Sequence, residues 1–262
     1  MSEQMVILQW SDVFIGLGLI AVAIGLSWFQ GFGLERDLAI GTLRSIVQLA
    51  ILGYVLVYLF ELKNLWIVVA ILLGMALIAA YTGRGRMKKP YPGMLPILWF
   101  SIACGSFFSV GYVTLISMRD PVALTPQYLI PLGGMIIGNS LNGITLGVER
   151  FHSELSLQRD RVECLLAMGA NGDRASHDCL KAAFGAAMIP TINALMVLGL
   201  IQIPGIMTGQ VMAGVSPVTA VMYQLVAMFM IAGGKVVVLT LGLRMGLRKY
   251  FTPEHQLRMD LV

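Results

Sequence analysis

A line of polar side chains runs through one apolar stretch of the chain. Met135, Asn139 and Asn142 stand at positions i, i+4 and i+7, so a helix would carry all three on one face. Amides inside a membrane need hydrogen-bond partners, and the same groups could line a route for a polar solute. The stripe is therefore either a set of interhelical hydrogen bonds or the lining of a translocation path.

Two cations, Arg44 and Lys235, also fall within apolar stretches. Gln48 stands four residues after Arg44, so both lie on one helix face, which we expect to turn toward protein or a water-filled path. Charge in the bilayer is costly and usually functional, but a long side chain two turns from a span end can also reach the interface. We place Arg44 and Gln48 with the stripe in the candidate path. The alternative that Arg44 and Lys235 only extend to the membrane interface stays open.

The energy source is indicated by what the apolar stretches lack. All 14 Asp and Glu residues lie in connections, tails or span edges, whereas transporters driven by an ion gradient generally keep a carboxylate in the membrane. The sequence has no G-x-x-x-x-G-K-[ST] phosphate loop. It also has no zinc-ligand spacing or Ser–His pair within the apolar stretches. We therefore expect no enzyme activity and no cofactor on this chain, and an energy source other than an ion gradient.

Ligand chemistry leaves the metal ligands unassigned. Imidazole is a common ligand of transition metals, but the three histidines, His152, His177 and His255, all lie outside the apolar stretches. The chain has 17 methionines, whose thioethers suit Cu(I), yet methionine is also a common gap filler. The three cysteines form no C-x-x-C motif and predict no disulfide framework.

Membrane-spanning helices must position these side chains. The 262 residues are 57% hydrophobic and only 12% charged, against about 25% charged in soluble domains, and the mean hydropathy is +0.81. A span needs roughly 20 apolar residues. Seven stretches qualify, near 13–30, 38–60, 65–81, 95–117, 128–148, 182–203 and 218–243. The predicted fold is all-α, a polytopic membrane bundle of about seven helices forming one transmembrane domain over 1–262.

The distribution of basic residues predicts the orientation. Most of the 18 Lys and Arg residues lie in the connections near 84–89 and 149–181 and in the C-terminal tail, whereas the opposite side holds only Lys63 and Arg119. The positive-inside rule then puts the N-terminus outside and the C-terminus in the cytoplasm. No basic run is interleaved with aromatics, which argues against a nucleic-acid partner.

The connection at 149–181 is too long for a plain turn. Its residues 153–169 have the pattern of an amphipathic helix, which stops at Asn171 and Gly172 before Asp173 caps a second helix. This predicts a cytoplasmic helix pair that either couples to a partner or lies on the membrane surface. The candidate coupling residues are Leu155, Val162, Glu163, Leu166 and Gly169.

A second broken segment follows the sixth stretch. Pro204 and Gly205 interrupt the helix, and broken backbone is tolerated at membrane depth only where protein or a cavity covers it. We interpret this turn as a candidate outer gate, with an exposed surface loop as the alternative. The candidate gate residues are Pro204, Gly205, Met207, Thr208 and Gln210.

Two resemblances to known families follow from these segments. Residues 163–170, ECLLAMGA, keep the Glu-to-Gly spacing of the loop by which permeases of ATP-binding-cassette transporters dock on their ATPase, although the usual two alanines are replaced. A second resemblance covers nearly the whole chain, to the Fet-type iron-export permeases, formerly an uncharacterised family with plant relatives associated with aluminium tolerance. Its residues are IPGIMTGQ at 203–210, AGVSP at 213–217, YQ at 223–224, RSIVQL at 44–49 and IIGNSLN at 136–142.

The second resemblance implies a permease subunit that exports metal ions, iron among them, from the cytoplasm. It implies a homodimer in the inner membrane, served by a separate cytoplasmic ATP-binding subunit that moves the 149–181 connection. The alternative is a self-contained channel or secondary carrier for a small ion or polar solute.

Overall fold

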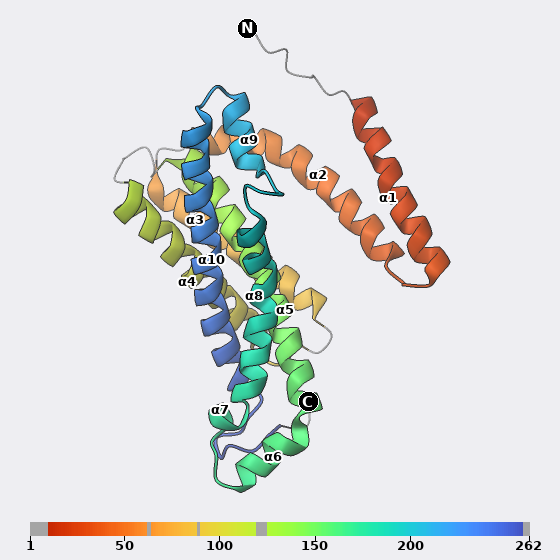
Figure 1. Cartoon of the computed structure of the whole chain (residues 1–262), viewed down its shortest axis with the longest axis vertical. Helices are drawn as coiled ribbons and strands as arrows, with labels where there is room; N and C mark the ends of the chain where they lie inside the picture. The colour runs from red at the N-terminus through yellow and green to blue at the C-terminus, as the bar shows by residue number, and fades with distance from the viewer. Residues whose placement is uncertain (1–9, 62–63, 88–89, 119–124, 259–262) are drawn as a thin grey trace. The chain divides into compact units, whose positions relative to one another are not determined.

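The computed structural model describes residues 10–61, 64–87, 90–118 and 125–258, which fold almost entirely into helices (Figure 1). In these ranges the only strand-like pairings are two isolated bridges, Leu198 with Gln202 and Phe251 with Leu257. Seven helices of the described ranges are long and apolar enough to cross a membrane. The predicted all-α polytopic bundle with seven spans is confirmed.

The first two spans form a compact unit of their own that ends at Glu61. Helix α1 (Trp10–Gln30) turns back into α2 (Glu35–Phe60) as a hairpin. The turn is closed by Ser27, whose hydroxyl donates to a carboxylate oxygen of Glu35 at 2.9 Å. No residue of α2 is buried, so its apolar surface is available to lipid or to other protein.

The second unit holds the remaining helices, and α5 is its centre. The elements are α3 (Leu65–Arg86), α4 (Met94–Tyr112), the π-helical turn η1 (Val113–Met118), α5 (Pro126–Leu157), α6 (Arg159–Ala167), α7 (Gly172–Ala175), α8 (His177–Val197), α9 (Gly205–Met212) and α10 (Pro217–Leu247). Helix α5 packs against α3, α4, α8 and α10. Figure 1 shows α6 and α7 at one end of this unit and α9 at the other. We call these the α6–α7 end and the α9 end.

Glycines let the helices of this unit approach closely. A Cβ atom at Gly242 of α10 would lie 2.5 Å from Ile144 of α5, and one at Gly246 would lie 2.7 Å from the Tyr91 hydroxyl. The glycine spacing therefore serves packing within the chain at these positions. Gly138 on α5 differs, because no atom lies within 4 Å of the place where its Cβ would stand.

Two predicted span boundaries and one predicted helix differ from the structure. The helix of the fifth predicted span does not stop near 148, since α5 continues to Leu157. The predicted amphipathic helix over 153–169 is in fact two pieces, because Gln158 leaves helical geometry (φ −103°, ψ 20°) between α5 and α6. The sixth span is also shifted, ending at Val197 instead of near 203. The prediction of one transmembrane domain over 1–262 stays a prediction.

Candidate functional site

The predicted stripe on α5 is present, and it is longer than the sequence indicated. Met135 and Asn139 are half-buried, and Asn142, Glu149 and Ser153 are exposed. Positions 135, 142 and 149 are seven residues apart, which is close to two helical turns, so they share one edge of the helix. We call these five residues the polar edge of α5.

The hydrogen bonds of the polar edge stay within one helix. The Asn139 side-chain amide donates to the Met135 carbonyl oxygen at 2.9 Å, on the same helix. Asn142 makes no side-chain hydrogen bond within the described part of the chain and is exposed. Neither amide joins α5 to another described helix, so their role as hydrogen bonds between helices of one chain finds no support here.

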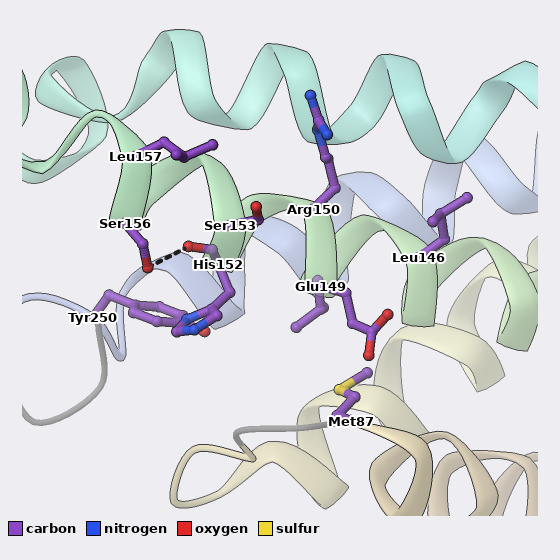
Figure 2. Close-up of a pocket in the computed structure, with 10 residues that line it drawn as sticks. Met87, Leu146, Glu149, Arg150, His152, Ser153, Ser156, Leu157 and Tyr250 are labelled. Carbon is purple, nitrogen blue, oxygen red and sulfur yellow. Dashed lines mark hydrogen bonds between the residues drawn. The ribbon is translucent and has the colours of Figure 1, made fainter. Parts of the chain in front are cut away.

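A cavity of about 580 Å³ opens at the α6–α7 end of the polar edge. Figure 2 shows Glu149 extending from α5 toward Met87, and His152 lying over the ring of Tyr250. Arg150 points to the opposite side of the helix in the same view, where it pairs with Glu154 at 2.6 Å. The residues that line the cavity are Met87, Leu146, Val148, Glu149, Arg150, His152, Ser153, Ser156, Leu157 and Tyr250.

Tyr250 and His152 line one side of this cavity and belong to an aromatic cluster behind it. The buried Tyr250 ring meets Phe151 edge to face at 5.5 Å, Tyr91 at 5.7 Å and His152 at 6.2 Å. Burial raises the pKa of Tyr250 to about 12. Burial, with a smaller contribution from Tyr250, also raises the pKa of Tyr91 above its ordinary value. Both phenols are therefore neutral at physiological pH, and the wall carries no phenolate charge.

The predicted coupling residues divide into two groups. Leu155 and Val162 are buried, with 0% and 1% of their surface exposed, so in this structure they belong to the core of the chain and not to an open docking surface. Glu163 and Leu166 are half-buried, and Gly169 is exposed with φ +89° and open space around it. The pattern identified an apolar face correctly, but part of that face is covered by the chain itself.

The turn between α6 and α8 is capped differently from the prediction. Asn171, rather than Asp173, caps α7, because its side-chain oxygen accepts from the Arg174 backbone N–H at 2.9 Å. An ion pair of 2.7 Å between Arg161 and Asp178 joins α6 to the first turn of α8. The α6–α7 end is thus linked directly to the start of a membrane span.

The candidate gate residues lie on a short helix and not on an open turn. Pro204 is the N-cap of α9, and Gly205, Met207, Thr208 and Gln210 are helical. The Thr208 hydroxyl donates to the Pro204 carbonyl at 3.1 Å, so this side chain is hydrogen-bonded within the α9 segment. The Gln210 side-chain oxygen is buried and has no hydrogen-bond partner among the described residues. Helix α9 packs against α10, and its gating role stays a proposal.

The two predicted intramembrane cations differ in environment. Lys235 is 4% exposed, and its ammonium donates to the Thr191 hydroxyl on α8 at 2.5 Å. A methyl group at Gly143 on α5 would lie 2.9 Å from two carbons of the Lys235 side chain. Lys235 therefore points into the bundle, and the alternative that its side chain extends to the membrane interface is wrong. Arg44 and Gln48 are exposed on α2, in the first unit.

The similarity to known proteins extends over almost all of the described helices. A family model described as an uncharacterised protein family, UPF0014, matches residues 10–251. The chain belongs to the UPF0014 family. No solved structure matches it.

Three UPF0014 relatives show how broad the family is. A UPF0014 membrane protein of Synechocystis is 38% identical over 231 residues, covering 88% of this chain and 89% of that protein. The Arabidopsis thaliana protein ALUMINUM SENSITIVE 3 is 29% identical, covering 95% and 93%. The Escherichia coli protein named probable iron export permease protein FetB is 28% identical, covering 93% and 92%. The resemblance that the sequence motifs indicated is confirmed.

Sequence reasoning missed that Glu149 and His152 of this UPF0014 chain line one cavity, together with Arg150 and Tyr250. Within the described residues no group of three or more His, Cys, Asp and Glu side chains could hold a metal ion, so no rich cluster drew attention to them. The available signal was the Glu-x-x-His spacing, which places both groups one turn apart only if α5 continues past 148.

Proposed function

We propose that this UPF0014 chain is the permease subunit of an ATP-binding-cassette transporter that exports a metal ion, iron, from the cytoplasm. The observation that carries the proposal is the polar edge of α5, which leads from the cavity at the α6–α7 end into the membrane span on a single helix. The E. coli relative is named a probable iron export permease, which supports permease activity and iron as the substrate.

The polar edge gives a reason for a homodimer. Exposed amides are costly against lipid and generally face protein or a water-filled cavity. Asn142 is exposed, and Gly138 has open space where a Cβ would stand, a combination that favours the close approach of another helix. We propose that the polar edges of two copies face each other and form the path between them.

The orientation of the chain in the membrane follows from charge. Basic residues of the connections and the tail are concentrated at the α6–α7 end, which the positive-inside rule assigns to the cytoplasm. The proposed location is the inner membrane, with the N-terminus outside. A fluorescent reporter fused after Val262 should then be active only in the cytoplasm, and strong activity of a periplasmic phosphatase fused there would refute this orientation.

The exposed part of α6 is the proposed docking surface for the ATPase. Met168 is 71% exposed, and it adjoins Gly169, whose left-handed backbone presents no side chain. Glu163 is held one turn from Arg159 by an ion pair of 2.9 Å. Leu155 and Val162 would support this surface from inside the chain, in place of the direct contact that the sequence predicted.

The test is co-purification with a co-expressed ATP-binding subunit and measurement of metal-dependent ATP hydrolysis. Glu163→Arg and Gly169→Leu should leave the permease inserted but abolish co-purification and stimulation. A truncated or reversed charge in a buried contact costs about 2–5 kcal/mol, and one at a rim costs little. Glu254→Arg, a charge reversal on the exposed C-terminal segment, serves as the matched control.

Two results would contradict the proposal. If Glu163→Arg and Gly169→Leu both keep full export, this segment is not the coupling surface. If the purified chain moves metal across vesicle membranes with no ATPase present, the chain is a self-contained channel or carrier instead.

A further inference from the structure

Glu149 and His152 lie one turn apart on the part of α5 that extends past the predicted span. Both line the cavity at the α6–α7 end, and Figure 2 shows both side chains on the cavity side of the helix. Residues three apart on a helix have Cβ atoms roughly 5–6 Å apart. Figure 2 shows the two side chains pointing apart, Glu149 toward Met87 and His152 over Tyr250. A single ion would contact both groups once the exposed Glu149 side chain turns toward the imidazole.

The charge of Glu149 is not neutralised by the helix that carries it. Its neighbour Arg150 points away and is bound to Glu154 at 2.6 Å. Glu149 itself is exposed to the cavity and has no ion pair with another described residue. The cavity thus offers an anionic oxygen beside an imidazole.

This donor pair favours a particular class of ion. Imidazole with carboxylate suits borderline divalent metals such as Fe²⁺, whereas thioether selects softer Cu(I). A Glu and a His three residues apart on one helix also hold iron in di-iron helix bundles. Two protein ligands, with water completing the coordination, make a weak site. Weak binding suits a cargo, because a conducted ion must be able to leave.

We propose that Glu149 and His152 form the loading site at which a divalent metal ion of the Fe²⁺ class enters the transporter. The inference rests on the proposed function as a metal exporter and adds the residues that select the cargo. Asn142 lies seven residues up the same edge, about 10 Å along the helix axis, and is the next polar group that the ion would meet. The aromatic wall around Tyr250 holds the imidazole in place.

The experiment measures Fe²⁺ binding by the full-length chain in detergent, under anaerobic conditions, with no ATPase and no nucleotide. The wild-type chain should bind Fe²⁺, and Glu149→Gln and His152→Gln should each weaken binding by about 10-fold or more, since even indirect metal partners are typically worth that much. Glu149→Asp keeps a carboxylate and should retain more affinity than Glu149→Gln.

The matched controls are Asp160→Asn and His177→Gln, which remove the same kinds of group at exposed positions on α6 and α8. Both should bind Fe²⁺ as the wild type does. Gel filtration before each titration shows whether a variant is folded. If Glu149→Gln fails to fold, His152→Gln and Glu149→Asp decide the question.

The inference is overturned if the wild-type chain binds no Fe²⁺, or if Glu149→Gln and His152→Gln bind it as tightly as the controls. Neither result affects the ATPase co-purification that tests the proposed function. Conversely, metal binding through these two residues without any association with an ATPase would support the loading site and contradict the proposed ATP-driven exporter.

Discussion

Leu155 and Leu157 provide a direct test of which face of the α5–α6 junction belongs to the protein's own core. The two leucines are two residues apart at the end of α5, yet Leu155 is 0% exposed and Leu157 is 76% exposed. Truncating a fully buried leucine to alanine costs about 2–5 kcal/mol, through lost burial and the cavity left behind. Truncating an exposed one usually changes stability by less than about 0.5 kcal/mol.

The expected shifts in melting temperature differ accordingly. In a protein of this size 1 kcal/mol corresponds to roughly 2–4 °C, so Leu155→Ala should melt roughly 4–20 °C below the wild type. Leu157→Ala should melt within about 2 °C of it. The measurement is thermal unfolding of the purified chain in detergent without an ATPase, followed by the tryptophan fluorescence and by the loss of the monodisperse gel-filtration peak.

The opposite ordering would refute this reasoning. If Leu155→Ala keeps the wild-type melting temperature but no longer co-purifies with the ATPase, Leu155 is a docking anchor, as the amphipathic pattern alone suggested. Its burial in the chain would then not describe the working state of the α6–α7 end.

Three further predictions concern the membrane core and the cavity wall. Asn139→Leu and Asn142→Leu should abolish transport while the protein stays inserted; poor expression with loss of the dimer would indicate a packing role instead. Thr191→Val should destabilise the chain by about 1–3 kcal/mol, because it leaves the buried Lys235 ammonium without its hydroxyl partner; unchanged thermal stability would refute that. The folded pKa of Tyr250, about 12 against 10.0, predicts stability that is fully present below pH 10 and lost as the pH rises toward 12. In Tyr250→Phe an alkaline melting series should show a smaller loss.

The number and class of the helices could be predicted from the sequence, because a lipid solvent demands long apolar runs. The end of α5 could not be predicted. Hydropathy locates the part of a helix that lies in lipid, but the helix itself continues for as long as its backbone hydrogen bonds do, here to Leu157. Because the predicted span ended near 148, the sequence did not show that Glu149 and His152 lie on the same helix as the span.

Whether a side chain is buried within the chain also depends on neighbours that the sequence does not identify. An amphipathic pattern shows that Leu155 and Val162 share an apolar face, but the chain or a partner could equally cover it. In the sequence, nothing distinguishes Lys235 from a lysine that extends to the membrane interface near the end of a span. Only the packing shows that Gly143 leaves room for its aliphatic stem and that Thr191 receives its ammonium.

The length of α5 has a mechanical consequence. Its 32 residues make a rod of about 48 Å, against a hydrocarbon core of about 30 Å, so a large part of it projects from the membrane. The projecting end carries Glu149 and His152, and the embedded part carries Asn139 and Asn142. A rigid tilt of about 10° around the rod's midpoint would swing its tip by about 4 Å. A push on the α6–α7 end would thus swing Glu149 and His152 sideways, whereas Asn139 and Asn142, which lie near the midpoint of α5, would hardly move.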